Sequence, residues 1–105
     1  MLVTISRFTD EGFSGWVECL LVDVQGRIWK FEEKVPVVST AVLWTDSEYP
    51  RQGSIACTIL TRKADEAGRR ILTIDTSRPW GIESTDGTTV FEVFADQLKG
   101  DDEGN

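Results

Sequence analysis

The fold is decided by residues 14–34, SGWVECLLVDVQGRIWKFEEK, which predict a β-hairpin. Apolar and β-branched residues dominate Ser14 to Val24, and polar and apolar side chains alternate from Arg27 to Lys34, as in half-buried strands. Gln25-Gly26 lies between the two runs, and glycine readily adopts the positive φ that a tight turn requires. We therefore expect two antiparallel strands joined at this turn.

Four further segments have strand-like patterns: Leu2–Phe8, Gly53–Arg62, Arg69–Asp75 and Thr88–Ala95. Each is rich in β-branched or aromatic residues and is flanked by turn-forming residues. The charged loop 63–68 joins two of these segments, so the sequence predicts a second hairpin.

The connection after Lys34 is less regular. Pro36 has no N–H to donate to a ladder, so Val35–Val38 is expected to form an edge, a bulge or an extended connection. Ser39 and Thr40 are good helix caps, so we expect one short helical turn over Ala41–Trp44.

These elements predict an all-β domain over residues 1–98, with about six strands and at most one short helix. A small antiparallel barrel is the first expectation, because a short chain can avoid exposed strand edges by closing its sheet. A two-sheet β-sandwich or roll is the alternative. Residues 99–105, KGDDEGN, hold no apolar residue, and we expect a disordered acidic tail there.

The charge restricts the class of partner. Eighteen Asp and Glu against eleven Lys and Arg give a net charge of −7. Such a surface repels nucleic acid and anionic lipid and attracts a basic protein. No run approaches the roughly 20 apolar residues of a membrane span, and no secretory signal is present, so cytoplasmic residence is expected.

Catalytic chemistry has little support in the sequence. The chain has no histidine, which removes the usual general base and a common zinc ligand. Cys19 and Cys57 lie in apolar runs, as buried structural thiols do. The sequence does not decide whether a disulfide joins them. We expect no catalytic residues, no metal site and no cofactor. A carboxylate-based hydrolase is the least favoured alternative.

Binding candidates are aromatic and charged residues in the connecting segments. Trp, Tyr and Arg are enriched among residues that anchor interfaces. Trp44 with Tyr49, and Arg78 with Trp80 and Glu83, are therefore the candidate binding residues. The alternative is that both tryptophans fold back to complete the core.

One stretch resembles a group of small bacterial proteins of unassigned function. It runs from Ile74 through Arg78-Pro79-Trp80-Gly81 to Val93, and Val35–Val38 and Tyr49–Cys57 are also similar to that group. The resemblance implies a short, β-rich, cytoplasmic protein of a type that overlaps with immunity proteins, which neutralise a toxin by binding it. It implies no particular functional residue.

The favoured function is therefore a non-catalytic protein-binding module, most concretely an immunity-like inhibitor of a bacterial toxin. The alternative is a small structural or regulatory subunit of a larger assembly, or a homodimer.

Overall fold

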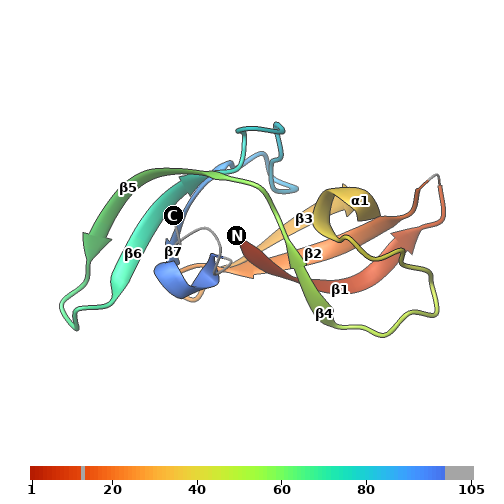
Figure 1. The fold of residues 1–105 in the computed structure, drawn as a ribbon, viewed down its shortest axis with the longest axis horizontal. Helices are drawn as coiled ribbons and strands as arrows, with labels where there is room; N and C mark the ends of the chain where they lie inside the picture. The colour runs from red at the N-terminus through yellow and green to blue at the C-terminus, as the bar shows by residue number, and fades with distance from the viewer. Residues whose placement is uncertain (13, 99–105) are drawn as a thin grey trace.

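The computed structural model describes residues 1–12 and 14–98 and contains two antiparallel sheets (Figure 1). One sheet has the strand order β3-β2-β1-β4 and the other has the order β5-β6-β7. The predicted all-β class is confirmed. A closed barrel is not found in the described part of the chain, so the barrel stays a prediction. The strands are β1 (Leu2–Asp10), β2 (Trp16–Val22), β3 (Ile28–Lys34), β4 (Arg51–Ser54), β5 (Thr58–Ala64), β6 (Arg70–Asp75) and β7 (Val90–Phe94).

Both predicted hairpins are present. Strands β2 and β3 pair without interruption from Trp16 opposite Lys34 to Val22 opposite Ile28. Their turn begins at Asp23, whose Oδ1 accepts the backbone N–H groups of residues 25 and 27, and Gly26 adopts φ of 84°. The turn between β5 and β6 repeats this geometry: Asp65 Oδ1 accepts two backbone N–H groups and Gly68 has φ of 82°. The pattern Asp-x-x-Gly-Arg therefore builds both turns.

The segment expected as one strand, Gly53–Arg62, is two strands in different sheets. Strand β4 pairs with β1, the chain then continues through Ile55–Cys57, and β5 pairs with β6 (Figure 1). The expectation failed because an extended chain keeps its alternating pattern while it passes from one sheet to the other. We call residues 51–59 the crossover segment.

Both expectations for this connection are wrong: Val35–Val38, expected to be an edge, a bulge or extended, is helical, and Ala41–Trp44, expected to be a helical turn, is not. Val35–Val38 forms the single-turn helix α1, with Pro36 in its first turn, where no N–H is needed. Ser39 follows in extended conformation, and residues 41–44 are not helical. A second short helix, the 3₁₀ turn η1, covers Ala95–Gln97.

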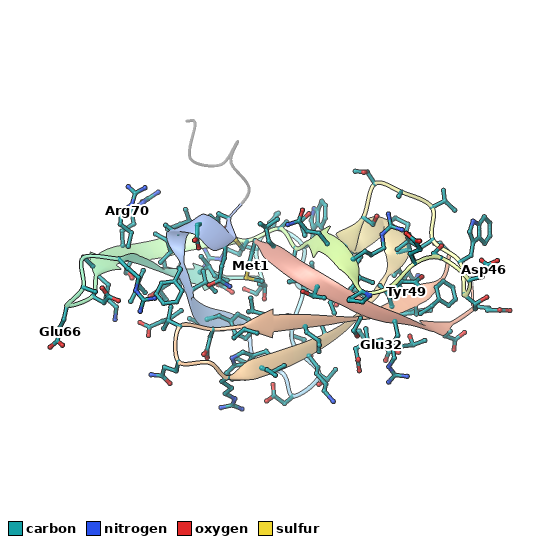
Figure 2. All side chains as sticks on the ribbon, turned by 90° about the horizontal axis from the view of Figure 1, so that it is seen from below. Met1, Glu32, Asp46, Tyr49, Glu66 and Arg70 are labelled. Atoms are coloured by element: carbon teal, nitrogen blue, oxygen red, sulfur yellow. The ribbon has the colours of Figure 1, made fainter. Side chains whose placement is uncertain are left out.

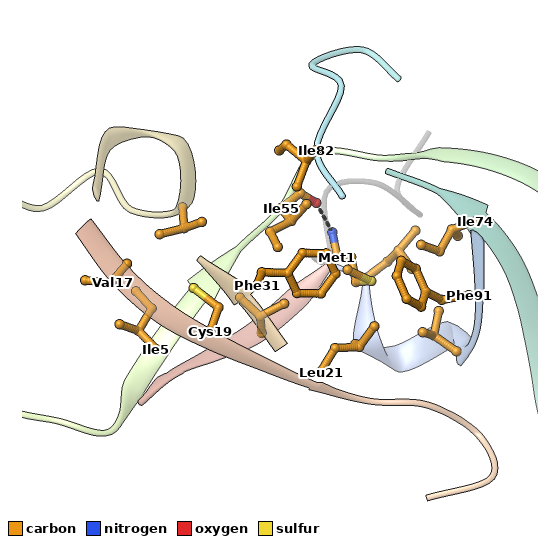
Figure 3. Close-up of a cluster of buried hydrophobic side chains, with 14 of the residues drawn as sticks. Met1, Ile5, Val17, Cys19, Leu21, Phe31, Ile55, Ile74, Ile82 and Phe91 are labelled. Atoms are coloured by element: carbon orange, nitrogen blue, oxygen red, sulfur yellow. Dashed lines mark hydrogen bonds between the residues drawn. The ribbon is translucent and has the colours of Figure 1, made fainter. Parts of the chain in front are cut away.

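The core lies where the inner faces of the two sheets meet (Figure 3). Phe31 of β3 is fully buried, and its ring centroid lies 5.6 Å from that of Phe91 in β7. Trp29 contacts the same ring edge to face at 5.1 Å. Met1 and Ile55 exchange two hydrogen bonds between main-chain atoms and extend the β1–β4 ladder into the crossover segment. The sheets therefore share one apolar core.

On the side away from the crossover segment, isolated hydrogen bonds connect the sheets. Val24 N–H donates to the carbonyl of Glu92 at 3.0 Å, and Thr85 N–H donates to that of Lys30 at 2.8 Å. These bonds form no ladder. None of the described helices has the length and apolar character needed to cross a membrane. The predicted tail at 99–105 lies outside the described residues.

Candidate functional site

The loop between β6 and β7 presents an exposed tryptophan from a closely bonded base. We call residues 76–84 the Trp80 loop. Thr76 is fully buried, and its Oγ1 donates to the carbonyl of Ile82 at 2.7 Å. Ile82 N–H donates back to the carbonyl of Thr76 at 3.0 Å. These two bonds close the loop, so residues 77–81 protrude from a fixed base.

Each end of the Trp80 loop has a further anchor. Ile82 is 4% exposed and joins the core cluster beside Ile55 (Figure 3). Before the loop, the Ser77 side chain and backbone N–H both bond to the Asp75 carboxylate and lower its pKa. At the last residue of the loop, Ser84 Oγ is buried, donates to Asp86 Oδ1 and accepts from Thr88 N–H. The loop conformation is therefore specified by its own side chains.

The loop carries three of the predicted binding residues: Arg78 and Trp80 lie in the protruding part, and Glu83 follows the closed base. Trp80 is 61% exposed, and Arg78 and Glu83 are also exposed. The Arg78–Pro79 peptide bond is cis. Leaving a tryptophan in water is energetically costly, so its exposure on a loop with a hydrogen-bonded base is unusual. The alternative that both tryptophans fold back to complete the core is wrong, because Trp80 is 61% and Trp44 63% exposed.

An open groove of about 850 Å³ lies beside Trp80. Residues 36–41 and the crossover segment line it, together with Pro79, Trp80, Leu98 and the first two residues of the chain. A groove with an exposed aromatic at its border can bury a partner's side chain or an extended segment. We call it the crossover groove.

The second predicted pair, Trp44 and Tyr49, lies elsewhere. Trp44 is 63% exposed, and its carbonyl accepts the Tyr49 hydroxyl at 2.7 Å, while Tyr49 itself is half-buried. Neither residue lines the crossover groove. Their loop lies beyond the first sheet, at the opposite end of the molecule from the β5–β6 turn at Glu66 (Figure 2). The structure therefore separates the five candidates into two sites.

The side chains that could bind a metal or take part in catalysis do not lie together. Within the described residues, no group of three or more His, Cys, Asp or Glu side chains is placed to hold a metal. Cys19 is a free, buried thiol, and burial raises its pKa to about 12, so it is not a nucleophile at neutral pH. Burial also raises the pKa of Glu33, but Glu33 does not line the crossover groove.

Sequence reasoning missed the walls of the groove. Helix α1 and the crossover segment become neighbours only through tertiary packing: a Cβ built on Gly53 would lie 2.9 Å from the carbonyl oxygen of Val38. The available signal was Gly53 itself, since glycine within a strand often marks a close backbone approach.

Comparison with known proteins adds no relative: no protein-family model matches the chain, and neither does any curated protein or solved structure.

Proposed function

We propose that this chain is a non-catalytic protein-binding module whose main contact surface is the Trp80 loop with the crossover groove. The observation that carries the proposal is Trp80, 61% exposed on a loop whose base is closed by the Thr76–Ile82 hydrogen bonds. A rigid, exposed tryptophan loses little conformational entropy on binding and buries a large area. Arg78 on the same loop adds a side chain that is frequent among binding anchors.

The charge supports a particular class of partner. A net charge of −7 accelerates encounter with a basic protein. A toxin that cleaves nucleic acid must bind a polyanion, and lysine and arginine side chains supply that affinity. An immunity-like inhibitor that occupies such a toxin is the most concrete form of the proposal, and it agrees with the resemblance drawn from the sequence.

A pair of matched variants tests the assignment. Trp80→Ala and Trp44→Ala remove the same side chain at nearly equal exposure, 61% and 63%, from two different sites. The partner is recovered from the native host by quantitative affinity purification and then reconstituted from purified components. Trp80→Ala should raise Kd by about 30-fold or more, as expected for an anchor residue. Trp44→Ala should change Kd by less than about threefold.

Two results would contradict the proposal. Equal affinity of Trp80→Ala and wild type for a reconstituted 1:1 partner would show that the contact surface lies elsewhere. Failure to recover any stoichiometric partner would argue against a binding module altogether.

A homodimeric subunit is the second candidate, and one surface favours it. The outer face of the first sheet exposes Val22 and Ile28, which are 49% and 58% accessible and lie opposite each other in the β2–β3 register. A shallow groove of about 530 Å³ includes both residues. A dimer mass by light scattering at micromolar concentration, lost in Val22→Thr/Ile28→Thr, would favour this function.

We also propose that the two sheets act as one incompletely closed barrel. The continuous crossover segment on one side and the Val24–Glu92 and Thr85–Lys30 hydrogen bonds on the other support it. Such closure would hold the Trp80 loop rigid relative to the groove.

A further inference from the structure

The β5–β6 hairpin has a charge opposite to that of the rest of the chain. Residues 62–70 contain four of the eleven lysine and arginine residues but only two of the eighteen acids. Figure 1 shows this hairpin projecting at one end of the molecule, whose longest extent is 44 Å. The projecting tip is therefore a basic element on an acidic protein.

Two cations of the hairpin are not neutralised within the molecule. Lys63 pairs with Glu92 at 2.8 Å, and Arg69 pairs with Asp65 at 3.1 Å. Arg62 and Arg70 are exposed and have no ion pair with any described residue. Their positive charge is available to a partner.

The same hairpin has an open backbone edge. Strand β5 is the outer strand of its sheet and pairs with β6 alone, and its last five residues are all exposed. In the turn, Asp65 N–H donates to the carbonyl of Arg69 at 2.9 Å, so these two residues form a hydrogen-bonded pair. Because bonded and non-bonded pairs alternate in an antiparallel ladder, Arg62 and Ala64 direct their N–H and C=O groups away from β6.

The sign of the charge distinguishes recognition from mere protection of the edge. Charged residues and bulges often protect strand edges, and the register shift at Ile59/Thr61 marks such an irregularity in β5. Such protection acts against the edges of other copies of the chain, which carry the same cations and are repelled. The same cations attract a strand that carries acidic side chains.

We infer that the edge of β5 between Thr61 and Ala64 binds an extended, acidic segment of a partner protein as an added antiparallel strand. The main-chain groups of Arg62 and Ala64 would supply the hydrogen bonds of β-strand addition. Arg62 and Arg70 would select carboxylate side chains. This surface is separate from the Trp80 loop, and the inference does not depend on the proposed function.

The test is an NMR titration of the ¹⁵N-labelled full chain with a blocked octapeptide that alternates valine and glutamate. The control peptide has lysine in place of glutamate. We expect saturable shifts of the amide signals of residues 61–64 with the acidic peptide and no saturation with the basic one. Arg62→Glu/Arg70→Glu should weaken binding at least about tenfold, because two attractions become repulsions.

Two further variants separate charge from backbone. Ala64→Pro removes one outward N–H while keeping both arginines, and proline is tolerated at such edge positions. It should abolish the saturable shifts. Lys30→Glu reverses one charge, half the change of the double variant, at a different edge strand and should leave binding within about twofold. Circular dichroism verifies that each variant is folded.

Three results of the peptide titration would overturn the inference. They are equal binding of the two peptides, retention of binding in Arg62→Glu/Arg70→Glu, and saturable shifts that map outside β5. If the chain alone gives a dimer mass with concentration-dependent shifts in β5, the occupant is a second copy and the assigned partner is wrong.

Discussion

The Trp80 loop depends on one buried hydroxyl, so Thr76→Val should destabilise the protein. The substitution keeps the shape of the side chain and removes Oγ1, which donates to the carbonyl of Ile82 at 2.7 Å and contacts that of Thr89 at 3.3 Å. A typical hydrogen bond contributes about 1 kcal/mol net, and a buried acceptor left without a donor adds to that loss. Thr76 is fully buried, so water does not replace the hydroxyl. We expect a loss of about 1.5 kcal/mol in the free energy of unfolding.

Urea denaturation followed by circular dichroism measures this loss, and thermal denaturation should show a decrease in Tm of about 6–12 °C. Thr61→Val is the matched control, because Thr61 is exposed on β5 and the same substitution there should cost less than about 0.5 kcal/mol. Amide exchange should also accelerate at residues 77–82 in Thr76→Val. The reasoning fails if the two variants have equal stability, or if Thr76→Val loses stability without faster exchange in the loop.

Two further predictions concern the close approach at Gly53 and the turn at Asp23. Gly53→Ala would place Cβ 2.7 Å from Ile5 Cδ1, and this overpacking should cost about 1–3 kcal/mol by urea denaturation, whereas Gly12→Ala should cost less than about 0.5 kcal/mol. Burial raises the pKa of Asp23, but hydrogen bonds from Trp29 and two backbone N–H groups outweigh burial and hold the pKa below its usual value. The Asp23 contribution to stability is therefore complete above the unfolded pKa and lost as the pH falls through the lower folded pKa. Asp23→Asn should flatten the stability profile below about pH 4, and an unchanged slope there would contradict this assignment.

The hairpins were predictable because their signals are local. Alternation sets the strands, and Gly26 and Gly68 occupy the positive-φ positions of their turns. The Asp-x-x-Gly-Arg pattern is visible twice in the sequence, at Asp23 and Asp65, although only the structure shows that the two turns share one geometry. Local chemistry therefore fixed these elements without help from the rest of the chain.

The helix and the sheet change were not predictable for two different reasons. Helix α1 is one turn long, too short for a helical period, and proline at its start is compatible with both helix and extended chain. The alternation of Ile55, Cys57 and Ile59 continues across the sheet change. Only the pairing of β4 with β1, which lies far away in sequence, divides the segment.

The residue types of the candidate site were predictable from the sequence, but its position in the fold was not. The sequence named Trp44 and Trp80 on equal grounds, and the two have nearly equal exposure. What distinguishes them is the groove beside Trp80, which depends on α1 and the crossover segment, the two elements that were mispredicted. Because these two elements were mispredicted, the sequence could not show which tryptophan lies beside a groove.

The crossover segment also connects the two proposed binding surfaces. Residues 51–59 line the groove beside Trp80, and the same backbone continues directly into the open edge of β5. A partner with a basic body could occupy the Trp80 loop while an acidic segment of it pairs with β5, so that opposite charges would fix its orientation. In that case Arg62→Glu/Arg70→Glu and Trp80→Ala would each weaken the same complex. If they impair two different complexes, the surfaces act independently, and the acidic segment belongs to a second partner.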